Sequence, residues 1–190
     1  MILHTPSSRS RFGLRGLPAI GPDRIAIGLG QRLDDAYHFV RHAATGGPEP
    51  VEAVLVGPGG TWVLSQAREH GRFRKRNGHW YRWSGSTDSW IPWEARMITE
   101  TRLAGHRLEL TLERAGLPSA VEACLLTSRE VTVDWDEGQV PGIHVHDNLD
   151  RLARRVARDE TLTDAQVERI VALLDPRQPL PRLAPSAPRG

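Results

Sequence analysis

The sequence predicts a mixed α/β fold in which helices flank a β-sheet. Short apolar segments lie on both sides of a Pro58-Gly59-Gly60 turn, and a second pair of strand-like segments surrounds Asn77-Gly78, the dipeptide most typical of a tight β-hairpin. Residues 94–115 repeat apolar side chains every three or four positions, as an amphipathic helix does. With 190 residues and 39% hydrophobic content, the chain suits one compact domain.

The first part of the domain is predicted to be a helix followed by a hairpin. Residues 23–44 have four apolar side chains near one helical face, although Gly28 and Gly30 weaken the first turns. A Gly-Gly-Pro break ends this helix. Strands are then predicted at residues 51–56 and 61–65. The four apolar positions of the helix are Ile27, Leu33, Tyr37 and Val40.

The remaining elements begin with the second hairpin. Its strands are predicted at residues 72–76 and 79–83, around a type I′ turn. The helix at residues 94–115 is followed by Gly116 and Pro118, which end it, and it is expected to cover the sheet. A last helix is predicted from Thr163, which has capping-box spacing to Gln166. Further strands are predicted at residues 121–127, 131–135 and 142–146, and another helix near Asp147.

Composition changes at both ends of the chain. Residues 1–22 contain Ser, Gly, Pro and Arg without a period, and residues 176–190 contain five prolines, so both segments are expected to be flexible or disordered. The domain is therefore expected at residues 23–175. No apolar run reaches the roughly 18 residues of a membrane span, and the N-terminus lacks the apolar core of a signal peptide. We expect a cytoplasmic protein that does not contact a membrane.

The charged residues and the single cysteine restrict the chemistry that the chain can perform. The 25 basic and 23 acidic residues give a net charge of +2, so local clusters matter more than the total. Cys124 is the only cysteine and lies in an apolar run, so we expect it to pack as a small hydrophobe and not to act as a nucleophile. Lys75 is the only lysine, and the other cations are arginines, which stay protonated.

The segment at residues 51–71 carries a family resemblance. An acidic residue opens an apolar strand that ends in Gly57-Pro58, and the next strand, Gly60-Thr61-Trp62-Val63-Leu64, ends in Ser65-Gln66-Ala67. This pattern resembles the nuclease-related domain (NERD) family, whose fold is similar to that of PD-(D/E)XK endonucleases and whose second strand ends in Glu-x-Lys. The resemblance covers about residues 25–156 and implies a restriction-endonuclease-like mixed sheet flanked by helices. Gly30-Gln31, Gly71, Trp80, Pro92 and the strand at residues 122–127 continue the likeness.

The resemblance also implies a magnesium site, but most of its chemical groups are replaced here. The positions that match the family's helix glutamate, strand aspartate, triplet glutamate and triplet lysine are Gln31, Glu52, Ser65 and Ala67. Mg²⁺ prefers several oxygen ligands, carboxylates above all, and only Glu52 retains a charge. We therefore expect no intact catalytic site, no bound metal and no other cofactor. The first interpretation is a catalytically inactive relative that binds DNA, RNA or another protein.

Two alternatives remain open from the sequence. A divergent nuclease would use Glu52 with Glu69 or Asp34, and it would require Mg²⁺. Lys75 is not expected to replace the missing lysine, because it lies eight residues beyond Ala67 and in the next hairpin. The other alternative is a purely structural domain. The sequence does not specify an oligomeric state.

A cluster of cations and aromatic residues at positions 68–93 predicts a nucleic-acid surface. Cations bind phosphates, and exposed rings stack on bases. Alternation along a strand puts Arg72, Arg74 and Arg76 on one face of the hairpin and the intervening residues on the other. The competing interpretation is a solvated arginine face above packed aromatic rings. The predicted nucleic-acid-binding residues are Arg68, Arg72, Arg74, Lys75, Arg76 and Arg82.

His144 and His146 are a weak candidate for a metal site. Their spacing puts both imidazoles on the same side of a strand, where they could bind zinc. However, the sequence has no second pair of Cys or His at a matching spacing, and Asp147 fits the N-cap of a following helix. We therefore predict no zinc site.

Overall fold

The structure, a computed structural model, describes residues 1–4, 22–45, 50–127, 131–135, 143–146 and 148–175. It confirms the mixed α/β fold class. Its larger sheet has six strands, which are, in spatial order, β1 (Ile2–His4), β2 (His38–Ala43), β3 (Val51–Gly57), β4 (Gly60–Gln66), β8 (Val121–Leu126) and β10 (His144–His146). Strands β2, β3 and β4 are antiparallel neighbours. The outer strands join in parallel, β1 to β2 on one side, and β8 to β4 and β10 to β8 on the other.

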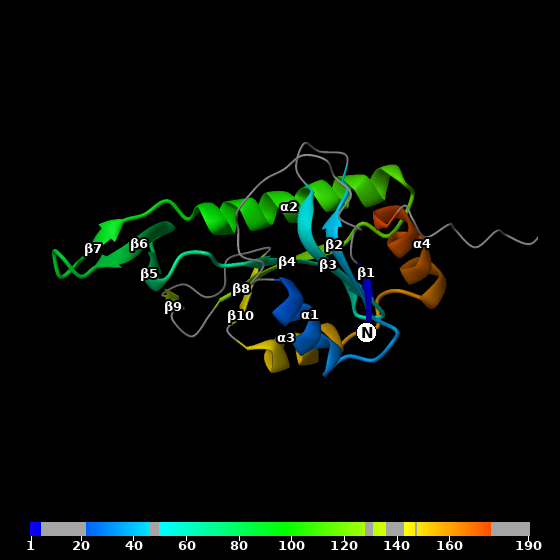
Figure 1. Ribbon diagram of the computed structural model, residues 1–190. Coiled ribbons are helices and arrows are strands. Elements are labelled where there is room, and N and C mark those ends of the chain that lie inside the picture. Colours follow the sequence, from blue (N-terminus) through cyan, green and yellow to red (C-terminus); the bar gives the residue numbers. More distant parts are fainter. Residues whose placement is uncertain (5–21, 46–49, 128–130, 136–142, 147, 176–190) are drawn as a thin grey trace, which may run out of the picture.

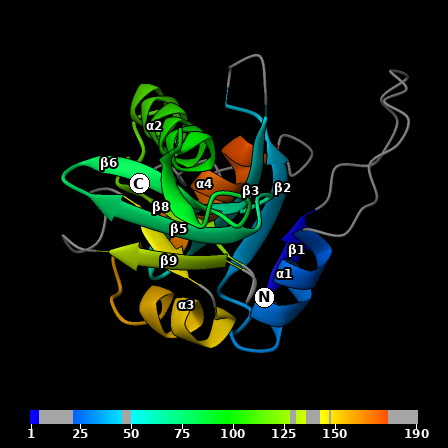
Figure 2. The same cartoon turned by 90° about the vertical axis from the view of Figure 1, so that its left-hand side faces the viewer.

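The helices of the described residues cover both faces of this sheet (Figures 1 and 2). On one face lie α2 (Arg96–Arg114) and α4 (Asp164–Leu174), and on the other lie α1 (Pro22–Gly30) and α3 (Leu149–Val156). Leu55 and Leu64 pack towards α1 and α3, whereas Val54 and Val63 pack towards α2 and α4. Each such side chain stabilises the fold by about 1.5–3 kcal/mol when fully buried. The sheet therefore has two apolar faces and separates two hydrophobic cores.

The turn between β3 and β4 is fixed by contacts with the chain after α3. Thr161 and Leu162 donate backbone hydrogen bonds of 2.7 and 3.1 Å to the Pro58 carbonyl oxygen. Gly59 lies so close to the carbonyl oxygen of Val156 that any Cβ at this position would overlap it. Glycine is thus required here by close backbone packing.

A second, four-stranded sheet has the order β7 (Ser89–Pro92), β6 (His79–Ser84), β5 (Gly71–Arg76) and β9 (Val131–Trp135). It projects from the body beyond one end of α2 (Figure 1). Asn77 and Gly78 have φ angles of 49° and 76°, so the type I′ turn predicted between β5 and β6 is confirmed. Strand β9 adds to β5 in parallel, and β7 adds to β6 in antiparallel direction.

The prediction of one helix over residues 23–44 is wrong. Helix α1 ends at Gly30, and residues 38–43 form β2. Phe39 and Val40 are both fully buried, each in the core on a different side of the sheet. A central strand buries consecutive side chains in this way, whereas a surface helix does not. The apolar positions fitted a helical period by coincidence, and pairing with β1 and β3 decided the outcome.

Two smaller predictions also need correction, and one strand was missed. Ile2–His4 forms β1 although residues 1–22 were expected to be flexible, and residues 5–21 lie outside the described residues. Strand β7 was not predicted. Helix α3 is capped by Asn148, whose side chain accepts a 2.7 Å hydrogen bond from the backbone of Asp150, and Asp147 lies outside the described residues.

Several local predictions are confirmed. Thr163 and Gln166 form a reciprocal capping box at the start of α4. Helix α2 and strands β8 and β9 lie where the sequence placed them. Cys124 is fully buried, and burial raises the pKa of its thiol to about 12. It packs as a hydrophobic residue, as expected. The predicted tail at residues 176–190 lies outside the described residues.

Candidate functional site

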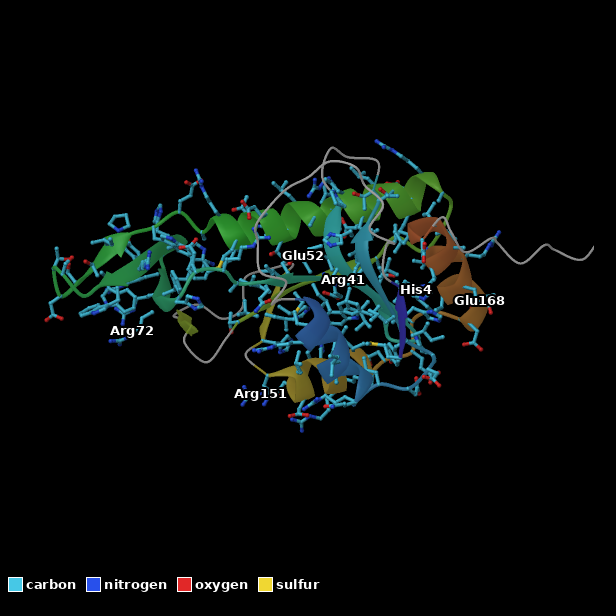
Figure 3. All side chains as sticks on the ribbon, in the orientation of Figure 1. His4, Arg41, Glu52, Arg72, Arg151 and Glu168 are labelled. Carbon is cyan, nitrogen blue, oxygen red and sulfur yellow. The ribbon has the colours of Figure 1, made fainter. Side chains whose placement is uncertain are left out.

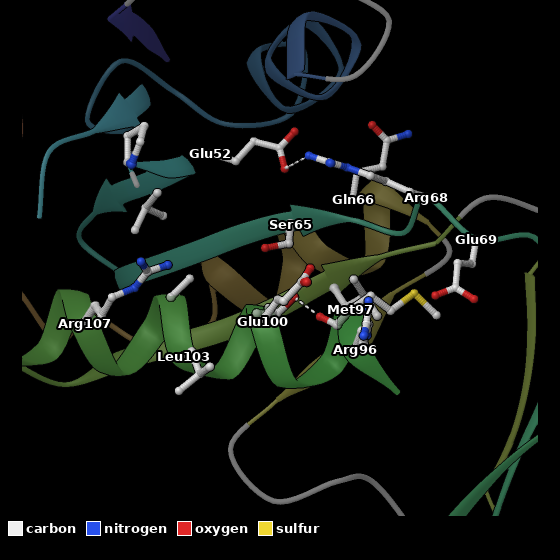
Figure 4. A pocket seen from close by; sticks show the side chains of 15 residues that line it. Glu52, Ser65, Gln66, Arg68, Glu69, Arg96, Met97, Glu100, Leu103 and Arg107 are labelled. Carbon is white, nitrogen blue, oxygen red and sulfur yellow. Dashed lines mark hydrogen bonds and ion pairs between the residues drawn. The ribbon is translucent and has the colours of Figure 1, made fainter. Parts of the chain in front are cut away.

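Strands β3 and β4 separate at one end, and a cleft begins there. Their last registered pair joins Ala53 to Leu64. The next residues, Glu52 and Ser65, line a cleft of about 610 Å³ between the sheet and α2 (Figure 4). The ladder of β3 and β4 therefore holds a carboxylate and a hydroxyl at the mouth of this cleft.

Acidic and basic side chains face the cleft together. Three residues of α2 contribute from successive positions along one side of the helix, and the segment after β4 contributes two more. Helical periodicity explains the first group, because residues four and seven positions apart share a helical face. The charged residues that line the cleft are Glu52, Glu69 and Glu100, with Arg68, Arg96 and Arg107.

Groups of the protein itself engage two of these carboxylates. The Arg68 guanidinium lies 3.8 Å from the Glu52 carboxylate, and the two side chains are 83% and 33% exposed. An ion pair this exposed contributes little to stability. Glu69 accepts a 3.1 Å hydrogen bond from the indole nitrogen of Trp93. Any cationic ligand of the cleft would therefore compete with Arg68 for Glu52.

The structure brings together two of the four positions that match the family site. Glu52 and Ser65 line the cleft. Ala67 is buried beside it, packs with Ile98 and donates a 2.8 Å backbone hydrogen bond to Leu126. Gln31 is exposed after the end of α1 and does not line the cleft. Among the described residues, no group of three or more His, Cys, Asp or Glu is arranged to hold a metal ion.

Sequence reasoning missed the contribution of α2 to the cleft. Glu100 and Arg107 belong to the polar side of the predicted helix, and nothing local distinguishes them from solvated residues. Glu100 lies four positions after Arg96, and Arg107 lies seven positions after Glu100. This spacing puts the three charged side chains on one side of the helix, which is a usable signal. It becomes informative only once the opposite wall of the cleft is known.

The projecting sheet has an arginine–tryptophan face. The strand register puts Arg74 beside Tyr81, and Trp83 beside Trp90. The Arg74 guanidinium lies 4.5 Å from the centroid of the Trp90 ring, and that of Arg72 lies 5.4 Å from Trp83 and 5.8 Å from Trp90. Cations at these distances are attracted to the faces of aromatic rings. We define this face by Arg72, Arg74, Arg76, Tyr81, Trp83 and Trp90.

The reverse face of the same sheet packs towards the body. Phe73 is fully buried, and its ring lies 4.4 Å from that of Trp93, which packs against the core beside α2. The Arg82 guanidinium lies 6.0 Å from the Phe73 ring, and Lys75 is on this side as well. The predicted separation of Arg72, Arg74 and Arg76 from Lys75 is therefore confirmed.

The six predicted nucleic-acid-binding cations consequently occupy three places. Arg72, Arg74 and Arg76 share the arginine–tryptophan face. Lys75 and Arg82 lie on the reverse face, and Arg68 lies at the cleft. Figure 3 shows Arg72 on the projecting sheet and Glu52 in the main body.

His144 and His146 lie on the same side of β10, as predicted, with ring centroids 6.2 Å apart. The His144 imidazole is within 2.9 Å of the Glu122 carboxylate on β8, and its ring lies 5.4 Å from that of Trp62. A carboxylate and an indole ring thus hold His144 in place. These contacts account for its position without a metal ion.

A second histidine pair links β1, β2 and the end of α4. His4 Nε2 lies 3.0 Å from His38 Nδ1, and His4 Nδ1 lies 3.3 Å from an Asp175 carboxylate oxygen. Burial lowers the pKa of His38, His4 and the N-terminal amine lower it further, and Glu168 opposes the shift. No sequence pattern predicted this cluster, because His4 belongs to the segment that was expected to be flexible.

Comparison with models of protein families, with curated protein sequences and with solved structures gives no match to this chain. None of the helices formed by the described residues is long and apolar enough to span a membrane.

Proposed function

We propose that this protein is a nucleic-acid-binding module, built on a scaffold related to the nuclease-related domain, whose cleft does not perform catalysis. The observation that carries the proposal is the arginine–tryptophan face. Arg72, Arg74 and Arg76 form one row along β5 on a sheet that projects from the body. Rows of arginines bind phosphates, and neighbouring rings can contact bases. The ligand class is DNA or RNA.

The element order supports the proposed scaffold. From α1 to β8 the main sheet follows the order helix, three antiparallel strands, helix and parallel strand. The family resemblance implies the order helix, hairpin, hairpin, long helix and strand, and the chain has these elements in that order, with β2 added before the first hairpin and β7 after the second. Glu52 lies where β3 and β4 separate, which is consistent with an inherited site.

The residues at this site support binding without hydrolysis. Ser65 and Ala67 replace the carboxylate and the lysine of the family triplet, so the cleft lacks the group that would polarise water and a second strand carboxylate for Mg²⁺. Arg68 further neutralises Glu52. A cytoplasmic location is part of the proposal.

Gel retardation of DNA and RNA at several salt concentrations tests binding. Replacing Arg72, Arg74 and Arg76 together by Gln should weaken binding strongly and reduce the slope of log K against log salt by about 2, because about 0.7 counterions are released per phosphate of a single strand. Arg72→Gln alone and Arg82→Gln are a matched pair, since each removes one charge, the first from the arginine–tryptophan face and the second from the reverse face. If neither DNA nor RNA is retarded at low salt, the proposal is wrong and a structural role is favoured.

A divergent nuclease is the second candidate, favoured by one observation. Glu52, Glu69 and Glu100 line the same cleft, although no group of three or more acidic side chains among the described residues is arranged to hold a metal ion. Incubation of plasmid and single-stranded DNA with Mg²⁺ or Mn²⁺ tests this candidate, with Glu52→Gln as the comparison. Cleavage that disappears in Glu52→Gln would establish the nuclease and overturn the non-catalytic proposal. Asp34, the other predicted ligand, does not line the cleft.

A further inference from the structure

Trp83 and Trp90 differ from the other tryptophans whose side chains the structure describes, Trp62, Trp80 and Trp93, which pack in or against the core clusters. Both are half-buried, and neither belongs to a core cluster of the described residues. Arginine side chains lie over their rings, with Arg74 4.5 Å from the Trp90 centroid and Arg72 5.4 Å from the Trp83 centroid. Because an arginine side chain is flexible and water-soluble, it can leave the ring at little cost, whereas a packed core residue cannot. These rings are therefore accessible to a flat ligand.

The width of the sheet argues against a duplex ligand. Four strands lie side by side in the order β7, β6, β5 and β9. At about 4.8 Å per gap, their backbones alone span about 14 Å. The major groove of B-DNA is about 12 Å wide and admits a helix or a two-stranded ribbon. This face is too broad to enter the groove.

The angle between the two indoles leads to the same conclusion. The rings of Trp83 and Trp90 lie 5.4 Å apart and are inclined by 71° to one another. Bases stacked on both rings would be inclined by a similar angle. Consecutive bases in a duplex are parallel and cover each other's faces, so only an unpaired, flexible strand can present them in this way.

We infer that the arginine–tryptophan face binds single-stranded nucleic acid, with unpaired bases stacked on Trp83 and Trp90 and phosphates bound by Arg72, Arg74 and Arg76. This inference rests on the proposed function and specifies the form of its ligand. The shared chemistry of the ligand is an exposed base beside a flexible phosphate chain, in DNA or in RNA.

Binding involves an exchange of contacts at each ring. A base takes the ring face that a guanidinium now covers, and the guanidinium moves to a neighbouring phosphate. The three arginines recur about every 7 Å along β5, since side chains of one face repeat every second residue. An extended strand can follow this row.

Fluorescence titration with oligonucleotides of about 15 nucleotides tests the inference. The ligands are oligo(dT), oligo(U), a mixed-sequence single strand and its duplex, with heparin as a polyanion that has no bases. The wild-type protein should bind the single strands more tightly than the duplex, and its tryptophan emission should fall. Trp83→Leu should weaken single-strand binding about tenfold and leave heparin binding unchanged, and Trp83→Phe should restore most of the loss.

The outcomes separate the inference from the proposed function. Equal or tighter binding of the duplex, or an unchanged affinity in Trp83→Leu, would overturn the stacking inference while arginine-dependent binding still stands. Failure of every nucleic acid to bind would overturn both. Trp90→Leu is the second variant if circular dichroism shows that Trp83→Leu disrupts the sheet. Binding of either oligo(dT) or oligo(U) supports the inference, and the tighter of the two identifies the preferred polymer.

Discussion

In the cleft, the Arg68 guanidinium lies 3.8 Å from the Glu52 carboxylate, whereas on the projecting sheet the Arg74 guanidinium lies 4.5 Å from the centre of the Trp90 ring. Both contacts attract a guanidinium group. A carboxylate offsets the charge of its partner, whereas a ring attracts the cation through its quadrupole and carries no opposing net charge. The same residue type therefore has different consequences in the two regions.

The two regions also differ in the balance of charged side chains. Three carboxylates and three guanidinium groups line the cleft, and they balance one another. On the arginine–tryptophan face, Arg72, Arg74 and Arg76 share one side of the sheet with three aromatic rings. We therefore expect a polyanion to be attracted to the second region and not to the first. This contrast is the reason for proposing a nucleic-acid site on the projecting sheet and not at the cleft.

The largest expected effect comes from removing the support beneath the arginine–tryptophan face. Phe73 is 1% exposed and lies under the β5 arginines, against Trp93. Phe73→Ala should lower the free energy of unfolding of the projecting sheet by about 3–5 kcal/mol, and nucleic-acid binding should fall with it. Urea denaturation followed by tryptophan fluorescence measures the loss. Ile91→Ala is the matched control, because Ile91 lies on the same side but is 43% exposed. Equal losses in the two variants would contradict the packing described here.

Acidification is expected to cause a smaller loss of stability. This loss distinguishes the stability of the fold from nucleic-acid binding. The pKa of His38 is lowered, chiefly by burial, so the unfolded chain binds a proton at a higher pH than the folded protein does. Stability should therefore decrease as the pH falls below about 6.5, the ordinary pKa of histidine. The arginines stay charged over this range. Urea midpoints at pH 7.5, 6.5 and 5.5 measure the loss, which His38→Asn should reduce. A urea midpoint that does not decrease with pH in the wild-type protein would contradict the lowered pKa of His38.

Predictions from the sequence succeeded where the deciding interactions are local. The Asn77-Gly78 turn needs only two residues that accept positive φ angles, and the Thr163 capping box needs only Gln166 three positions later. The alternation of Arg72, Arg74 and Arg76 follows from the strand itself. Each of these features could be predicted because the responsible residues are neighbours in the chain.

Predictions failed where distant elements decide. Residues 38–43 became a strand because β1 and β3 pair with them, although their apolar spacing also fitted a helix. Glu100 faces the cleft only because α2 crosses the end of β4. The register of β6 with β7 brings Trp90 to the arginines, and β7 was not predicted. The sequence identified the cations and the aromatic residues of the candidate site, but not which ring lies beside which arginine.

The smallest expected effect is the difference in strength between the two arginine contacts, measured in the same way for both. Double-mutant cycles for stability would combine Arg74→Gln with Trp90→Leu, and Arg68→Gln with Glu52→Gln. We expect a coupling of about 0.5–1 kcal/mol for Arg74 and Trp90 and less than about 0.5 kcal/mol for the exposed pair of Arg68 and Glu52. Raising the salt concentration to about 1 M shortens the Debye length to about 3 Å, so the coupling between Arg68 and Glu52 should vanish while that between Arg74 and Trp90 largely persists. If the coupling in the cleft is the larger and survives salt, then Arg68 is a buried partner of Glu52, and the two regions do not differ in the way that their geometry indicates.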